Sequence, residues 1–264
     1  MSPSPSDPLS VEASQARYAT EREQGKSLIR DGFETAWGWS GPAGRLRAER
    51  RAQFLIDAAQ LQPGMRCLEL GCGTGEFTTR LVSSGCELVA VELSEATAEE
   101  CRQRVGHGAE VVVGNVETGE GLEGRCFDAM VGVSVLHHLN LELCMENTIL
   151  ARLKPGGRFA FSEPNMANPQ VWAERHIPAI GRWRHTTPHE TAFRQHELRR
   201  TFERAGLAVE VCEPFDFLHP STPPSLLPLL RRVERSLERS PAGRIAGSVR
   251  IAGRRPPTGG SGQP

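Results

Sequence analysis

A glycine-rich turn between two apolar runs restricts the fold of this sequence more than any other feature. The apolar run Arg66–Leu70 ends at Gly71-Cys72-Gly73-Thr74-Gly75, residues 76–84 have helical character, and a second apolar run covers Glu87–Glu92. Glycines allow a tight turn and let a ligand approach the backbone closely. The order of strand, glycine turn and helix predicts a parallel α/β unit with a ligand at the turn, although a plain strand-to-helix loop is the alternative.

The alternation of strands and helices continues along the chain. Ser94 is expected to cap a helix that runs to Val105, and Pro155-Gly156-Gly157 is expected to end a helix over residues 141–153. Further strands are predicted at residues 109–113, 127–133, 158–162 and 207–212, with a last one at 245–252. This pattern predicts an α/β fold, a doubly wound and mainly parallel sheet with helices on both faces.

The length of 264 residues and a hydrophobic fraction of 38% suit one α/β domain with additions. We predict a disordered tail over 1–15, an N-terminal helical cap region over 16–62, a cofactor-binding core over 63–163, a substrate-side insertion over 164–194, a C-terminal part of the core with an inserted helix over 195–253, and a second disordered tail over 254–264. The inserted helix, 224–239, places Leu226, Leu230, Val233 and Leu237 on one face. We expect that face to pack on its own domain, with a dimer contact or a substrate-cavity wall as alternatives.

Composition excludes several classes of partner. The net charge of −1 provides no global positive field for nucleic acid or an anionic membrane, and no apolar run approaches the roughly 20 residues of a membrane span. The seven cysteines form no C-x-x-C pair, so neither a zinc site nor a disulfide framework is indicated, and the Ser/Pro-rich start has no leader-like apolar run. We therefore expect a reduced, cytoplasmic setting without a metal, a nucleic-acid partner or a membrane span.

Acidic residues around the turn indicate which ligand it binds. Glu92 ends the second strand, 21 positions after Gly71, where a carboxylate accepts hydrogen bonds from both ribose hydroxyls of an adenosine, unless it is only a solvated strand-end residue. In a dinucleotide fingerprint the third glycine falls at position 76, but Glu76 stands there and would repel a pyrophosphate. Glu69, before the glycines, suits the methionine ammonium, directly or through water. These charges favour S-adenosylmethionine, a phosphate-free cation, over NAD.

Five stretches in the same order carry a family resemblance. They are E-L-G-C-G-T-G at 69–75, V-A-V-E-L-S at 89–94, V-G-N-V-E at 113–117, F-D-A-M-V at 127–131 with S-V-L-H-H-L at 134–139, and L-K-P-G-G-R at 153–158. The sequence resembles the class I S-adenosylmethionine-dependent methyltransferases, nearest to small-molecule enzymes of the ubiquinone/menaquinone-biosynthesis and natural-product type. The resemblance implies a Rossmann-like, seven-stranded sheet with one antiparallel strand near an edge, and S-adenosyl-L-homocysteine as product.

The resemblance also implies the residues that hold the cofactor. Asn115 would meet the exocyclic amine of adenine, where many relatives have Asp, and the Val116 N–H would meet a ring nitrogen; an amide oxygen still accepts such a bond. The full set implied for the cofactor is Glu69, Gly71, Cys72, Gly73, Gly75, Glu92, Leu93, Asn115, Val116 and Val133.

Two histidines are the candidate catalytic residues. His137 and His138 follow the fourth strand at the carboxyl end of the sheet, where ligands of open α/β sheets bind. Histidine acts as a base near pH 7, so either side chain is suited to remove the proton of an oxygen acceptor. The alternative is that they cap a helix or pack beside the cofactor.

Four further residues are predicted to bind the substrate. Glu163 and Asn165 follow the fifth strand and either bind polar groups of the acceptor or only shape a turn. Trp37 either closes over the site as an aromatic lid or anchors a helix, and His189 either lines the acceptor pocket or is solvated. The arginines near residues 45–51 either contact an acidic acceptor or form a solvated helix face.

We predict an enzyme that transfers a methyl group from S-adenosylmethionine to a small-molecule acceptor by in-line displacement, with oxygen ahead of nitrogen or carbon. The sulfonium is already activated, so the protein mainly supplies alignment and dry surroundings. The alternatives are a methyltransferase acting on protein or RNA, and a non-catalytic S-adenosylmethionine-binding module. For the oligomeric state, we expect a monomer or a homodimer.

Overall fold

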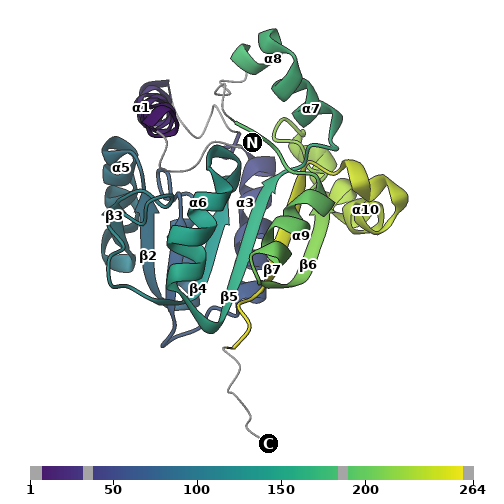
Figure 1. Ribbon diagram of the computed structural model, residues 1–264. Coiled ribbons are helices and arrows are strands. Elements are labelled where there is room, and N and C mark those ends of the chain that lie inside the picture. Colours follow the sequence, from purple (N-terminus) through teal and green to yellow (C-terminus); the bar gives the residue numbers. More distant parts are fainter. Residues whose placement is uncertain (1–7, 32–37, 184–189, 258–264) are drawn as a thin grey trace, which may run out of the picture.

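A seven-stranded sheet runs through the computed structural model, which describes residues 8–31, 38–183 and 190–257 (Figure 1). The strand order is β3-β2-β1-β4-β5-β7-β6; β1 to β5 are parallel, and β7 is antiparallel to both of its neighbours. The predicted fold, including its antiparallel strand near an edge, is confirmed. The strands are β1 Arg66–Leu70, β2 Glu87–Glu92, β3 Glu110–Val113, β4 Phe127–Val133, β5 Leu153–Pro164, β6 Ala208–Phe215 and β7 Ser248–Arg254.

Helices cover both faces of the sheet. In Figure 1, α3 lies behind the sheet, α5 covers its β2–β3 end, and α6 and α9 lie in front. The α-helices are α1 Pro8–Asp31, α3 Pro42–Ala59, α4 Thr78–Leu81, α5 Glu95–Val105, α6 Leu141–Cys144, α7 Pro169–His176, α8 Pro178–Trp183, α9 Gln195–Arg204 and α10 Leu227–Arg239. Short 3-10 turns are η1 Val82–Ser84, η2 Gly106–Gly108, η3 Leu136–His138, η5 Pro224–Leu226 and η6 Pro241–Ile245, and η4 Met145–Leu150 is π-helical.

The central strands are apolar on both sides because both faces are covered. Leu68 and Leu70 of β1 face the α6 and α9 layer, whereas Cys67 faces the α3 layer, and all three are fully buried. Continuous apolar runs are typical of parallel strands in this position. Ser94 caps α5 by accepting a hydrogen bond from the Thr97 N–H, as predicted.

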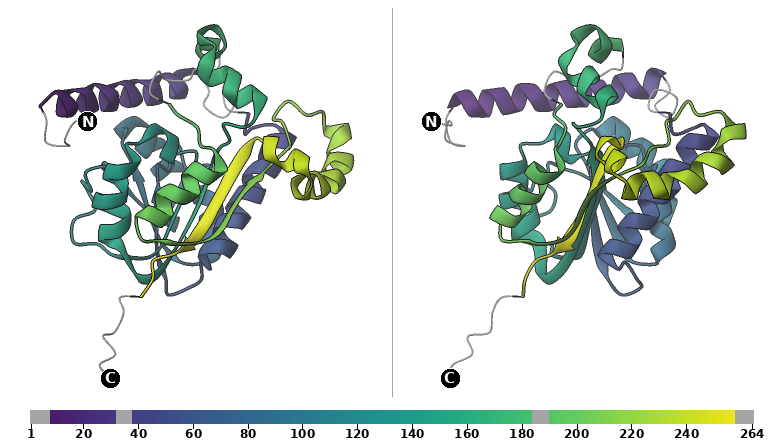
Figure 2. Two further views of the ribbon diagram at one scale, coloured as in Figure 1. Left: turned by 45° about the vertical axis from the view of Figure 1, so that its right-hand side comes forward. Right: turned by 90° about the vertical axis from the view of Figure 1, so that its right-hand side faces the viewer.

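The strand order reverses at β1 and β4, and such a switch point opens a crevice at the carboxyl ends of the strands. α1 lies across this edge, and α7 and α8, from the predicted insertion over 164–194, rise above it (Figure 2). Gly25 of α1 packs on Ser94, where an added Cβ would lie 3.0 Å from the Ser94 Oγ. No helix in the described ranges has the length and apolar character needed to cross a bilayer.

Several predicted boundaries are wrong. The chain is helical from Pro8, so the predicted disordered tail over 1–15 is in part α1. The predicted helix over 141–153 leaves α-geometry after Cys144. β5 begins already at Leu153, which pairs with Phe127 before an irregularity in the register. Pro241–Ile245 forms a 3-10 turn, which delays β7 to Ser248. Residues 258–264 of the second predicted tail lie outside the described part.

The predicted apolar face of the helix over 224–239 is correct only in part. Leu230 packs against the domain beside Leu218, and Leu237 is half-buried. Leu227 and Glu234 face the domain, while Leu226 and Val233 are exposed. Glu234 accepts hydrogen bonds from the Phe217 and Leu218 N–H groups, so a buried carboxylate rather than the apolar stripe sets the orientation of α10.

Candidate active site

The carboxyl edge of the sheet encloses a cavity of about 570 Å³. Its floor is the glycine turn with the ends of β2 and β4, its roof is α1, and its walls come from α7, from the start of α3 and from the segment after β6. A cavity of this size holds a small organic ligand, and the switch point of an open α/β sheet is the expected place for it.

The glycine turn and Glu92 form one rigid unit. Gly71 has φ +63°, and a Cβ there would lie 2.4 Å from Val135, so only glycine fits. The Gly73 N–H donates to one oxygen of the Glu92 carboxylate and the Ser94 N–H donates to the other, both at 3.0 Å. These bonds hold the carboxylate at the edge of the cavity.

Eight of the ten residues predicted to hold the cofactor line this cavity: Gly71, Cys72, Gly73, Glu92, Leu93, Asn115, Val116 and Val133. Glu69 and Gly75 do not line the cavity, so a direct contact with the cofactor does not fit, while a contact of Glu69 through water stays a prediction. An added Cβ on Gly75 would lie 2.9 Å from the Cys101 Sγ, so this glycine serves close packing against α5. One Glu69 oxygen has no partner among the described residues, and burial raises the pKa of Glu69 to about 8.

Carboxylates at the turn fit a nucleoside without phosphates. Glu92 and Glu76 both line the cavity beside Gly73. A pyrophosphate placed there would face two negative groups, whereas a sulfonium nucleoside would be attracted by them. The residues present therefore fit S-adenosylmethionine and do not fit a dinucleotide.

A buried carboxylate at the adenine end of the cavity anchors α1. The Glu117 side chain is fully buried; it accepts two bonds from Arg17 at 2.5 and 2.6 Å and one each from the Tyr18 hydroxyl and the Asn140 N–H at 2.9 Å. The Glu117 N–H donates to the Asn115 Oδ1 at 2.9 Å. This bond orients the Asn115 side chain, which is predicted to contact adenine. Sequence patterns missed Arg17 and Tyr18 because α1 has no regular apolar stripe that would mark a contact face.

The histidines occupy a sharp turn behind which a second carboxylate is buried. Ser134 has φ +53°, in the left-handed region, and directs η3 back over the end of β4. The Val135 and Leu136 N–H groups both donate to Glu163 Oε1 at 3.0 Å, and His137 Nδ1 lies 2.8 Å from Glu163 Oε2. Glu163 is fully buried and is not part of the cavity lining, so it is a positioning residue and not the predicted substrate ligand.

Burial shifts both members of this pair toward their neutral forms. It raises the pKa of Glu163 to about 7 and lowers the pKa of His137 well below its usual 6.5. His137 is therefore a neutral imidazole at neutral pH. When Glu163 is ionised, the His137 Nδ1–H donates to it, and Nε2 is then the nitrogen available to accept a proton.

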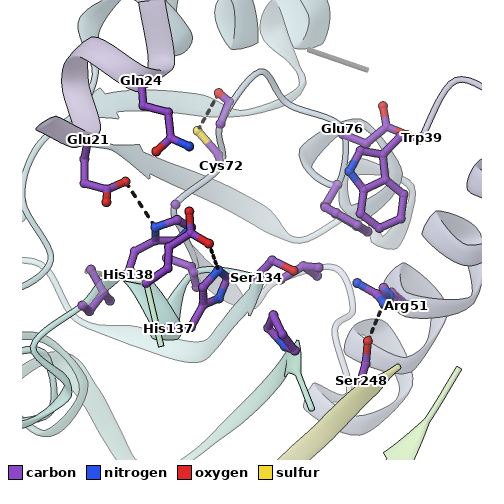
Figure 3. A pocket seen from close by; sticks show the side chains of 18 of the residues that line it. Glu21, Gln24, Trp39, Arg51, Cys72, Glu76, Ser134, His137, His138 and Ser248 are labelled. Carbon is purple, nitrogen blue, oxygen red and sulfur yellow. Dashed lines mark hydrogen bonds and ion pairs between the residues drawn. The ribbon is translucent and has the colours of Figure 1, made fainter. Parts of the chain in front are cut away.

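His138 contacts the roof of the cavity. Its Nδ1 lies 3.2 Å from Glu21 of α1, a contact visible in Figure 3. Burial opposes protonation, but the hydrogen bond to Glu21 and the charge of Glu190 outweigh it and raise the pKa of His138. We interpret His138 as a contact between the floor and α1.

Ring nitrogens of both histidines and a Glu190 oxygen lie within 4.8 Å of one another, and these are metal-ligand atom types. His137 Nε2 is 3.9 Å from Glu190, which pairs with Arg175 of α7 at 2.8 Å. A guanidinium therefore already balances the charge of Glu190 in this cluster.

None of the remaining residues predicted to bind the substrate is placed in the cavity by the described part of the structure. Asn165 donates to the Arg244 and Ala246 carbonyls and accepts from the Ala167 N–H, so main-chain groups occupy its amide and the substrate role does not fit. Trp37 and His189 lie outside the described residues.

One wall of the cavity is cationic. The Arg51 side chain is 4% exposed, donates to Ser248 and lies near the ring of Trp39 (Figure 3). Arg51 also donates to Asp216, and Arg47 likewise lies over the Trp39 ring. Burial lowers the pKa of Arg51 to about 10, so it remains charged at neutral pH. The predicted alternative of a solvated helix face is wrong here, and the wall suits a carboxylate such as that of methionine.

Comparison with known proteins agrees with this geometry. A family model described as methyltransferase domain matches residues 44–211. The chain is 32% identical to squalene methyltransferase 1 of Botryococcus braunii, 28% to nodulation protein S of Rhizobium tropici and 26% to a ubiquinone biosynthesis O-methyltransferase of Xanthomonas axonopodis pv. citri. These matches cover 52, 51 and 49% of this chain and 39, 58 and 56% of the relatives, so the chain spans about half the length of the curated relatives it matches.

Solved structures share the fold at lower identity. The complex between the Haloferax volcanii Trm112 methyltransferase activator and the putative methyltransferase matches with a TM-score of 0.62 and 19% identity, over 90% of this chain and 99% of that one. Magnesium protoporphyrin IX methyltransferase from Synechocystis, with bound S-adenosylhomocysteine, matches with a TM-score of 0.61 and 14% identity, also over 90% and 99%.

Proposed function

The chain belongs to the class I S-adenosylmethionine-dependent methyltransferases, and on that premise we propose that it methylates an oxygen atom of a small-molecule acceptor. S-adenosylmethionine supplies a methyl group already activated by the sulfonium, and S-adenosylhomocysteine is the product. The observation that carries the proposal is the hydrogen bond between His137 Nδ1 and the buried Glu163, which leaves the second ring nitrogen for the acceptor.

The two residues divide the work of proton removal. As the new O–C bond forms, the proton of the acceptor hydroxyl passes to His137 Nε2. The Glu163 carboxylate holds the ring in the required tautomer and stabilises the imidazolium that results. General-base catalysis of this kind contributes about 10² to 10⁴ in rate.

The other residues bind the cofactor and exclude water from the cavity. Glu92 and Asn115 hold the nucleoside, Arg51 faces the carboxylate of its methionine part, and α1 covers the crevice through Arg17 and Glu117. Methyl transfer depends on alignment and on dry surroundings, which a roofed cavity provides.

The size of the cavity and the charge of the chain favour a small acceptor. About 570 Å³ holds a nucleoside with a small molecule beside it, and a net charge of −1 does not attract RNA. We keep a cytoplasmic setting as part of the proposal, because all seven cysteines are free thiols and six are buried.

Labelled methyl transfer into a cell extract separates the candidate functions. We expect label from S-adenosylmethionine in the small-molecule fraction; label in protein or RNA would contradict the proposal, and binding without any transfer would favour a non-catalytic module.

Once an acceptor is identified, Glu163→Gln tests the base. Glutamine keeps an oxygen for the Val135 and Leu136 N–H groups but carries no charge, so we expect kcat to fall about 10²-fold or more. In the wild type, Glu163 is protonated below its pKa of about 7, so kcat rises with pH through that region. The variant loses this inflection, while Glu146→Gln, at an exposed site, keeps it. An unchanged profile in Glu163→Gln would remove the pair from the mechanism.

A further inference from the structure

The surface of η5 and α10 exposes an apolar row. Leu226, Leu229 and Val233 are 47, 59 and 39% exposed, although leucine and valine are usually buried. Their spacing of three and four residues places them along one side of the helix. The other large apolar side chains exposed among the described residues are Trp172 on α7, Ile177 directly after α7, and Ile245 at the end of η6.

α10 also carries four exposed arginines, Arg231, Arg232, Arg235 and Arg239. Arg232 lies next to the apolar row, one turn after Leu229, and the other three lie on the opposite flank of the exposed side. Within the described ranges none of the four has a carboxylate partner. The two acids of α10 do not neutralise them, because Glu234 and Glu238 turn inward to Arg50. Arg102, Arg125 and Arg250, by contrast, each pair with a glutamate.

Three of these arginines surround a hollow. Pro228, Arg231, Arg232 and Arg235 line a shallow depression on the outer side of α10. Guanidinium groups bind phosphate oxygens in a bidentate manner, so the hollow is suited to a phosphate. The hollow and the apolar row together define the α10 face: Leu226, Leu229, Val233 and the four arginines.

We propose that the α10 face docks on the surface of an anionic lipid bilayer. The apolar row enters the boundary between headgroups and acyl chains, and the arginines meet the lipid phosphates, as in interfacial amphipathic helices. A second copy of this chain is a poorer occupant because its own arginines would repel these. RNA is also a poorer one because it would leave the exposed leucines in water.

The attraction is local, because the whole chain has a net charge of only −1. α10 is also tied to the cavity wall: the Asp216 N–H donates to Glu238 at 2.7 Å, and the Phe217 and Leu218 N–H groups donate to Glu234 at 2.9 and 3.2 Å. Residues 216–218 line the cavity, so docking brings one of its walls to the bilayer. The docking itself does not depend on methyl transfer.

Sedimentation with lipid vesicles tests the proposal on the full chain. We expect binding to phosphatidylcholine vesicles that contain about one third phosphatidylglycerol, no binding to phosphatidylcholine alone, and loss of binding between about 0.1 and about 0.5 M NaCl. Each arginine near such a surface contributes about fivefold in affinity. Changing Arg231, Arg232, Arg235 and Arg239 together to glutamine should therefore weaken binding several hundredfold, by about 5⁴.

Matched variants separate the α10 face from general charge. The triple variant R194Q/R200Q/R204Q removes three exposed arginines in and next to α9 and should leave vesicle binding unchanged. L229S/V233S keeps all charge and should weaken binding at every salt concentration. Equal loss in the triple variant, or equal binding to both kinds of vesicle, overturns the proposal.

Three further outcomes would overturn it. Light scattering that shows a dimer in the wild type and a monomer in the four-arginine variant would assign the face to a second copy. Tighter binding to a single-stranded polynucleotide than to vesicles would assign it to nucleic acid. Inorganic phosphate that displaces the protein from vesicles at millimolar concentration would assign the hollow to a free anion.

Discussion

Removing the charge of Glu117 should release α1 from the cavity. In the structure this fully buried carboxylate accepts two bonds from Arg17 and one each from Tyr18 and Asn140. Breaking a buried ion pair by removing one partner costs about 3–5 kcal/mol. In Glu117→Gln the Arg17 side chain, 13% exposed in the docked helix, regains water only if α1 moves away. We therefore expect the cost to appear as undocking of α1, a shift of about 100-fold or more in its equilibrium.

Hydrogen exchange measures that equilibrium directly. Amides of α1 should lose about two orders of magnitude in protection in Glu117→Gln while those of β1 and β4 keep theirs. Affinity for S-adenosylmethionine should fall as well, because the open helix leaves the adenine end in water. Glu23→Gln is the control, since Glu23 lies on the same helix but is 65% exposed and, among the described residues, pairs with Lys26 alone. If α1 were equally protected in both variants, the anchoring role of Glu117 would be refuted.

Two further predictions concern the floor and the cationic wall. Glu92→Ala should weaken S-adenosylmethionine binding by about 1–3 kcal/mol in calorimetry, since the ribose bonds and the brace on Gly73 are lost; an unchanged affinity would exclude Glu92 from the site. Burial opposes ionisation of Asp216, but Arg47 and Arg51 outweigh it and lower its pKa. Because the pKa of Asp216 is lower in the folded state than its unfolded value of about 3.9, the ionised carboxylate stabilises the fold fully above that unfolded value. The stabilisation is lost as the pH falls through the folded-state pKa. Asp216→Asn should lower the free energy of unfolding by about 3–5 kcal/mol at neutral pH. Chemical denaturation at a series of pH values should also show a smaller loss of stability toward acid pH in the variant than in the wild type. The same loss in both proteins would contradict this prediction.

The fold was predictable because its signals are local. Strands such as Arg66–Leu70 and Phe127–Val133 are short apolar runs bounded by glycine or polar residues, and the structure has them at those positions. The orientation of α10 was not predictable, because the hydrogen bonds from main-chain groups of residues 217 and 218 bury Glu234. Such bonds join segments whose proximity no periodicity reveals.

The residues of the candidate site also fall into those that the sequence could predict and those that it could not. Residues whose role depends on backbone position, such as Gly71, Glu92 and Asn115, line the cavity as predicted. Glu163 and Asn165 were placed correctly at the end of β5, but the direction of each side chain depends on which distant N–H or carbonyl it meets. The contributions of α1 and of the arginines on α3 appear only when these helices are placed over the sheet.

A crystal soaked with S-adenosylhomocysteine tests the central claim most directly: a turn of glycines flanked by carboxylates holds a nucleoside without phosphates, and His137 faces the open space beside its sulfur. We expect ribose hydroxyls on Glu92, adenine against Asn115, and the His137 Nε2 directed toward that space. A crevice around Gly73 that stays empty or accepts a dinucleotide, or an imidazole that turns away from the sulfur, would contradict it.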